Sequence, residues 1–154
     1  MQRRDFVALS GLTALLAANS SAAEDDDYFV KDTNTPLNVL HIYASEDGES
    51  HMRDVLVSAD AEGIPNTSLK MNVYKPKKID WHTVPMPWFT INMTGDIEVE
   101  VSSGERRVIK TGDLVFLDDT HGKGHLTKPL TDDITNLFIG VPKDFDFLAW
   151  ATGK

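Results

Sequence analysis

Apolar and polar residues alternate with a period of two along much of the chain after Leu37. Residues 97–102 read Ile-Glu-Val-Glu-Val-Ser, and residues 69–74 read Leu-Lys-Met-Asn-Val-Tyr. This alternation is typical of half-buried antiparallel strands, which point apolar side chains inward and charged side chains outward. The pattern therefore predicts that the apolar residues of both segments, Leu69, Met71 and Val73 among them, face the core.

Two further runs also predict strands. Residues 114–117 are continuously apolar, as in a strand covered on both faces, and residues 134–141 form a strand that Pro142 ends. Turn signals recur at short intervals between the runs, at Gly48, Gly63, Gly95, Gly104, Gly112, Gly122 and Gly124. Many short strands separated by such turns predict an all-β sandwich or barrel.

The first 23 of the 154 residues differ from the rest. Arg3 and Arg4 precede an apolar stretch at 7–18 and small residues at 21–23. This order is typical of a secretory signal, and the arginine pair indicates twin-arginine export to the periplasm or the medium of a bacterium. An ordinary secretory signal is the alternative. The apolar stretch is too short to span a membrane stably, so we expect no membrane insertion after cleavage.

The remaining chain divides into three expected parts. An acidic linker covers residues 24–36, a barrel domain covers 37–142, and an aromatic tail covers 143–154. The tail is expected to form a short helix, to close one opening of the barrel, or to take part in a homodimer contact.

Composition narrows the chemistry. The chain has no cysteine, which excludes disulfides and thiolate catalysis, and any metal must be bound by histidine, carboxylate or backbone oxygen. The formal charge of −9 argues against nucleic acid and anionic membranes as partners, because both attract clustered lysine and arginine.

The candidate site begins on the strand that follows Trp81. If this strand stays extended through Pro85 and Pro87, its core face carries Phe89, Ile91 and Met93. The opposite face then mixes aromatic, thioether, hydroxyl and amide groups, which suits a pocket for a small molecule. The residues on this opposite face of the strand are His82, Val84, Met86, Trp88, Thr90 and Asn92.

The other end of the candidate site lies in residues 118–125, which read Asp-Asp-Thr-His-Gly-Lys-Gly-His. The glycines beside Lys123 let the backbone approach a ligand closely, and Lys123 suits an anionic one. Asp119 is expected to orient a histidine or to bind the ligand; capping of the turn is the alternative. His125 ends the segment.

Together these segments resemble the cupin superfamily of RmlC-like proteins. Residues 81–95 resemble its first motif and residues 112–125 its second, and the resemblance extends over about residues 37–142. It implies a double-stranded β-helix, a jelly-roll-like barrel. The form Trp-His-x-x-Pro followed by Asp-Asp-Thr-x-Gly-Lys-Gly-His resembles small single-domain cupins.

The resemblance to metal-binding cupins is incomplete. Their first motif offers two histidines one residue apart and then a glutamate. Here His82 matches the first histidine, but Val84 replaces the second and Trp88 stands near the glutamate position. His125 matches the histidine of the second motif. A divalent metal (zinc, iron, manganese or nickel) is therefore optional and needs a third ligand, for which His51 is a better candidate than His41.

The sequence thus predicts an exported cupin that binds a small organic molecule. His82 and His125 are the expected acid and base of an isomerase or lyase reaction, or two ligands of a metal. A periplasmic protein that binds a small molecule without catalysis is the alternative. The residues expected to contact the ligand are Trp88, Met86, Thr90, Asp119 and Lys123.

Overall fold

In the computed structural model, the described residues are 37–75 and 77–154, so the predicted signal peptide (1–23) and acidic linker (24–36) lie outside them. The described chain forms ten strands and one short helix. In chain order these are β1 (Leu37–Ala44), β2 (Ser50–Val57), β3 (Ser68–Tyr74), β4 (Ile79–His82), β5 (Trp88–Thr94), β6 (Ile97–Val101), β7 (Arg106–Ile109), β8 (Leu114–Asp118), β9 (His125–Pro129), β10 (Ile134–Gly140) and α1 (Phe147–Thr152).

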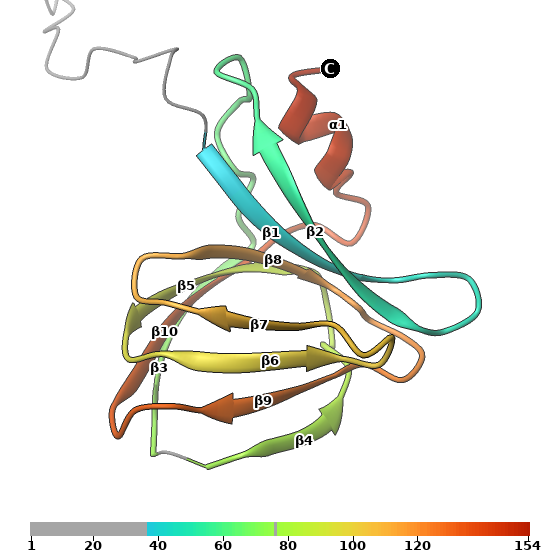
Figure 1. The fold of residues 1–154 in the computed structure, drawn as a ribbon. Helices are drawn as coiled ribbons and strands as arrows, with labels where there is room; N and C mark the ends of the chain where they lie inside the picture. Colours follow the sequence, from blue (N-terminus) through green and yellow to red (C-terminus); the bar gives the residue numbers. More distant parts are fainter. Residues whose placement is uncertain (1–36, 76) are drawn as a thin grey trace, which may run out of the picture. The chain divides into compact units, whose positions relative to one another are not determined.

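The strands build two facing sheets (Figure 1). The larger has the order β2-β1-β8-β5-β10-β3, and the smaller has the order β4-β9-β6-β7. From β3 onward the chain passes back and forth between the sheets, except at the β6–β7 hairpin. All pairings are antiparallel except β1 with β8. This winding is a double-stranded β-helix, so the predicted all-β barrel is confirmed.

The main core lies between the sheets and follows the predicted alternation. Val99 and Val101 of β6 are 3% and 0% exposed, as their period of two predicted. Strand β8 is buried on both faces, also as predicted, because Val115 and Leu117 join the core between the sheets while Phe116 joins a second cluster.

The second cluster covers the outer face of the six-stranded sheet. Phe116 of β8 stacks on Phe147 of α1 with ring centroids 4.4 Å apart. The ring centroids of Phe89 in β5 and Trp150 in α1 are 5.4 Å apart. Asp146 begins α1 by accepting a hydrogen bond from the Ala149 backbone N–H at 2.9 Å. The aromatic tail is therefore a short helix on the outside of a sheet and does not close a barrel opening. No helix in the described part of the chain is long and apolar enough to cross a bilayer.

The predicted direction of β3 is wrong. Leu69, Met71 and Val73 alternate as expected, but they are 68%, 65% and 75% exposed. β3 is an edge strand paired only with β10, and the residues of β10 opposite Lys70 and Asn72 line the interior. Directly opposed residues share a face, so the apolar side chains of β3 point outward. The alternation of apolar and polar residues indicates a strand, but it does not show which face of the strand the rest of the protein covers.

This assignment predicts unequal effects of threonine substitutions. Met71→Thr is expected to change the free energy of unfolding by less than about 0.5 kcal/mol, because Met71 is exposed. Val99→Thr is expected to lower it by about 2 kcal/mol, because a hydroxyl enters the core. Urea denaturation of both variants checks the difference, and an equal loss would contradict the outward orientation of β3.

The predicted continuous strand after Trp81 is also wrong. Residues 83–87 separate β4 in the small sheet from β5 in the large one, because Pro85 and Pro87 interrupt strand pairing. Phe89 is buried as predicted, but Met93 is 47% exposed.

Candidate functional site

His82 and His125 face each other across two paired strands. His82 ends β4, His125 begins β9, and the register places them directly opposite. Opposed residues of an antiparallel pair share a face, and their ring centroids lie 4.4 Å apart. Both side chains line a cavity between the two sheets. The structure thus brings together the two histidines that the sequence singled out.

Asp119 fixes the orientation of the His125 ring. Its carboxylate is fully buried, and Oδ2 lies 2.6 Å from Nδ1 of His125. Ser50 donates a longer hydrogen bond of 3.4 Å to the same oxygen, and the backbone carbonyl of Asp119 accepts from the Val84 N–H. An ionised carboxylate can only accept hydrogen bonds, so Nδ1 of His125 carries the proton of the neutral ring. Nε2 is then unprotonated and can accept a proton.

The surroundings of His82 favour the neutral form of its imidazole. Its Nδ1 lies 2.8 Å from the backbone carbonyl of Asp80, which only accepts, so Nδ1 is the protonated nitrogen. Burial lowers the pKa of His82, and the neighbouring His125 lowers it further, although the Asp80 carbonyl and the charge of Asp119 oppose this. His82 therefore favours its uncharged form at neutral pH.

The cavity beside the histidines has a volume of about 480 Å³. Its walls are mainly apolar, and both sheets contribute to them. Trp88 and Thr90 of β5 line it as predicted, and neither the Trp88 Nε1 nor the Thr90 Oγ1 has a hydrogen-bond partner among the described residues. Buried polar groups are normally paired, so these two unpaired atoms stand out among the residues of the cavity wall.

Asn136 and Phe138 of β10 also line the cavity, although they were absent from the predicted site. Phe138 packs edge-on against Trp88 with centroids 5.1 Å apart, and Asn136 donates to the side chain of Asn92 at 2.8 Å. The alternation of residues 134–140 carried the signal, because the polar Asn136 lies on the same face as Ile134.

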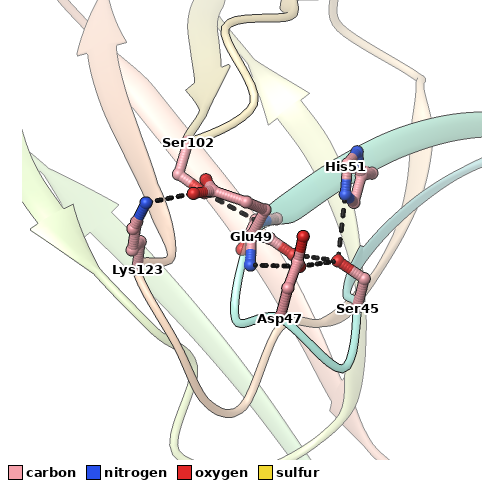
Figure 2. Close-up of polar contacts among 7 residues, drawn as sticks. Ser45, Asp47, Glu49, His51, Ser102 and Lys123 are labelled. Carbon is pink, nitrogen blue, oxygen red and sulfur yellow. Dashed lines mark hydrogen bonds and ion pairs between the residues drawn. The ribbon is translucent and has the colours of Figure 1, made fainter.

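Three of the five predicted ligand contacts do not line the cavity, namely Met86, Asp119 and Lys123. Met86 is not among the residues that line the cavity and instead lies close to Gly140. Lys123 forms an ion pair with Glu49, whose carboxylate also contacts Ser102 (Figure 2). The backbone of Lys123 donates to the Gly48 carbonyl at 2.9 Å. The glycine-rich loop thus approaches the β1–β2 turn of its own chain closely.

His51 does not join the other two histidines. It contacts Ser45 at 3.0 Å (Figure 2). Its ring centroid also lies 5.7 Å from that of Tyr43. Successive side chains of a strand point to opposite faces, so the inward position falls to Ser50, which contacts Asp119. Within residues 37–75 and 77–154, no group of three or more His, Cys, Asp or Glu side chains is placed to hold a metal ion.

A fourth histidine, His41, is buried outside the cavity, beneath α1. Its ring lies 4.6 Å from that of Phe147, and its Nδ1 accepts a hydrogen bond from Arg53 at 3.0 Å. Burial lowers the pKa of His41; a contact with Asp118 raises it and the charge of Arg53 lowers it. His41 therefore favours its uncharged form at neutral pH.

Acidification is expected to destabilise the protein through His41. Its pKa is lowered in the folded state, so the unfolded chain binds more protons once the pH falls below the ordinary value of 6.5. The stabilisation is complete above that value and declines below it. We expect the Tm to fall between about pH 7.5 and 5.5, and to fall less in His41→Gln, which retains an acceptor for Arg53. An equal fall in both proteins would contradict this role of His41.

Comparison with known proteins finds distant structural similarities but no family. No protein-family model and no curated protein matches the chain. A cupin-like protein from Thermotoga maritima is 21% identical, with 84% of this chain and 100% of that chain covered and a TM-score of 0.41. An RmlC-like cupin family protein with a double-stranded β-helix fold, from Methanocaldococcus jannaschii, is 15% identical over 75% of this chain and 87% of its own, with a TM-score of 0.41.

A putative ethanolamine utilization protein from Salmonella typhimurium is 12% identical, with 71% of this chain and 99% of that chain covered and a TM-score of 0.39. All three TM-scores lie below 0.5, so the fold assignment rests on the strand order and register of the chain itself. On that basis the protein is a double-stranded β-helix barrel with a histidine pair in its wall.

Proposed function

We propose that the barrel binds a small organic molecule and that His125, oriented by Asp119, transfers a proton on it together with His82. The reaction class is isomerisation or lyase chemistry. The observation that carries the proposal is the Asp119–His125 contact of 2.6 Å at the wall of an apolar cavity. With the predicted signal peptide, the proposed place of action is the periplasm or the medium.

Each group has a role in such a proton transfer. The Asp119 carboxylate holds His125 with Nε2 as the basic nitrogen and stabilises the imidazolium that forms when Nε2 accepts a proton. His82 stands opposite as the second proton carrier. Trp88 and Thr90 offer unpaired polar atoms that orient the bound molecule, and the apolar walls exclude water.

The described residues do not fit a resident catalytic metal. Catalytic sites of this kind use three protein ligands, whereas the cavity offers two imidazoles. The candidate third ligand, His51, contacts Ser45 instead, and the Asp119 carboxylate is hydrogen-bonded to His125. The proposed proton transfer therefore includes no metal step.

This donor set predicts weak metal retention. Protein purified without chelator is expected to contain roughly one zinc, iron, manganese or nickel ion per ten chains or fewer, because two imidazoles bind a divalent ion weakly. Elemental analysis by mass spectrometry measures the content. A stoichiometric metal that is lost in His82→Ala or His125→Ala would contradict the prediction.

Binding without catalysis is the second candidate function. The unpaired Trp88 Nε1 and Thr90 Oγ1 favour it, because they attract a ligand whether or not a proton is transferred. The two functions share the cavity and differ in the need for His125.

Hydrogen–deuterium exchange separates the two functions. Small ketones and 2-oxo acids are incubated with the protein in deuterated water, and deuterium at the carbon next to the carbonyl is followed by NMR. We expect exchange catalysed by the protein, lost in His125→Gln and strongly reduced in His82→Gln. His121→Gln is the control, because His121 lies in an exposed loop. Exchange that persists in both cavity variants would reject the catalytic role, and binding without exchange would favour the second function.

A further inference from the structure

We infer that the ligand is an elongated organic carboxylate, whose anionic head is held by Lys75 and Lys77 and whose other end reaches His82 and His125. The inference rests on the proposed function, since it names the class of molecule that the same cavity takes.

The first observation is the charge of the cavity lining. The chain has 24 acidic and 15 basic residues, yet the lining contains Lys75 and Lys77 and no aspartate or glutamate. Neither lysine has a carboxylate within 4 Å among the described residues, whereas the adjacent Lys78 is 3.7 Å from Asp80. Two unpaired ammonium groups on a site without carboxylates favour an anionic ligand.

The second observation is the distance between the lysines and the histidines. His82 pairs with His125 at one end of the β4–β9 ladder, and Ile79 pairs with Thr127. Lys77 precedes Ile79 by two residues, so it lies towards the Pro129 end of β9. Figure 1 shows β4 and β9 running side by side in opposite directions. Four residue steps from His125 to Pro129 span about 13 Å, which sets the length of a ligand that reaches both ends.

The third observation is the wall between the two ends. It is formed by aliphatic side chains of β6 and β8, including Val99 and Val115, and by Phe138. A small, fully polar anion held at the lysines would leave this wall in contact with water. An apolar chain or ring attached to the carboxylate covers it, and about 480 Å³ lies within the usual range for small-molecule sites.

Octanoate and its uncharged methyl ester are suitable probes. Binding to the purified protein is measured by calorimetry and by the indole N–H signals of the tryptophans in NMR spectra. We expect octanoate to bind about ten-fold more tightly than methyl octanoate at low salt, because each exposed lysine contributes a factor of a few. The Trp88 indole signal is expected to shift, while that of Trp150, which donates to the Glu62 carbonyl, stays in place.

The double variant Lys75→Gln, Lys77→Gln tests the head group. Its affinity for octanoate is expected to fall to within about two-fold of that for the ester, and that for the ester to stay unchanged. Lys78→Gln is the matched control, because Lys78 is next in sequence but is paired with Asp80 and does not line the cavity. An unchanged Tm shows that each variant is folded.

The outcomes distinguish the inference from the function on which it rests. If both probes shift the Trp88 signal with equal affinity and the double variant changes neither, the inference is wrong and ligand binding in the cavity stands. If neither probe shifts the Trp88 signal, the inference and the binding part of the proposed function both fail.

Discussion

Replacement of Gly124 by alanine is expected to lower the free energy of unfolding by more than about 3 kcal/mol. Gly124 is buried and has a φ of +73°, where an L side chain is strained. A Cβ there would also collide with the backbone carbonyl of His82 and approach the Thr83 nitrogen to 2.9 Å. All these atoms are backbone, so no side chain can move aside. Urea denaturation followed by tryptophan fluorescence measures the loss.

Gly104→Ala is the matched control for this substitution. Gly104 has a φ of +97°, but a Cβ there would have no atom within 4 Å. It therefore reports the backbone strain alone, about 1 kcal/mol. The difference between the two variants measures the close approach of the glycine-rich loop to His82. Equal losses would show that the Gly124 backbone does not approach the His82 carbonyl as closely as the structure indicates.

Asp119→Ala is expected to lower the free energy of unfolding by about 3 kcal/mol. The substitution leaves the Nδ1–H of His125 buried without its acceptor and removes the acceptor of the Ser50 hydroxyl. A buried polar group without a partner costs about 1–3 kcal/mol, and the cavity left by the side chain adds to that cost. Thermal and urea denaturation measure the loss. The imidazole N–H signal of His125 in NMR spectra is expected to broaden or disappear at the same time.

Asp119→Asn separates shape from charge. The amide oxygen still accepts from His125, so we expect stability within about 1 kcal/mol of the unaltered protein. Deuterium exchange on a bound ketone is nevertheless expected to be lost, because a neutral amide does not stabilise the imidazolium. If the alanine variant is as stable as the asparagine variant, the hydrogen bond to His125 does not contribute to the free energy of unfolding. If the asparagine variant retains full exchange, the carboxylate has no catalytic role.

The candidate site shows which parts of a site the local sequence pattern can predict. His82, His125, Trp88 and Thr90 were predicted to share a pocket, and the structure places all four on the cavity wall. Their residue types and the motif spacing indicated this without coordinates. Lys123 was predicted to bind an anion for its place between two glycines, but the structure pairs it with Glu49. The partner is 74 positions away in the chain, so the sequence around Lys123 does not indicate this ion pair.

The sequence by itself determined the strand period, the turn positions and the all-β class, because these depend on neighbouring residues. Only the tertiary structure decided which face of β3 is covered, which side of β2 His51 takes, and how Asp119 meets His125. Each depends on strand pairing and on the docking of distant segments. A strand pattern looks the same whichever of its two faces is buried, so only the packed neighbours determine where a histidine points.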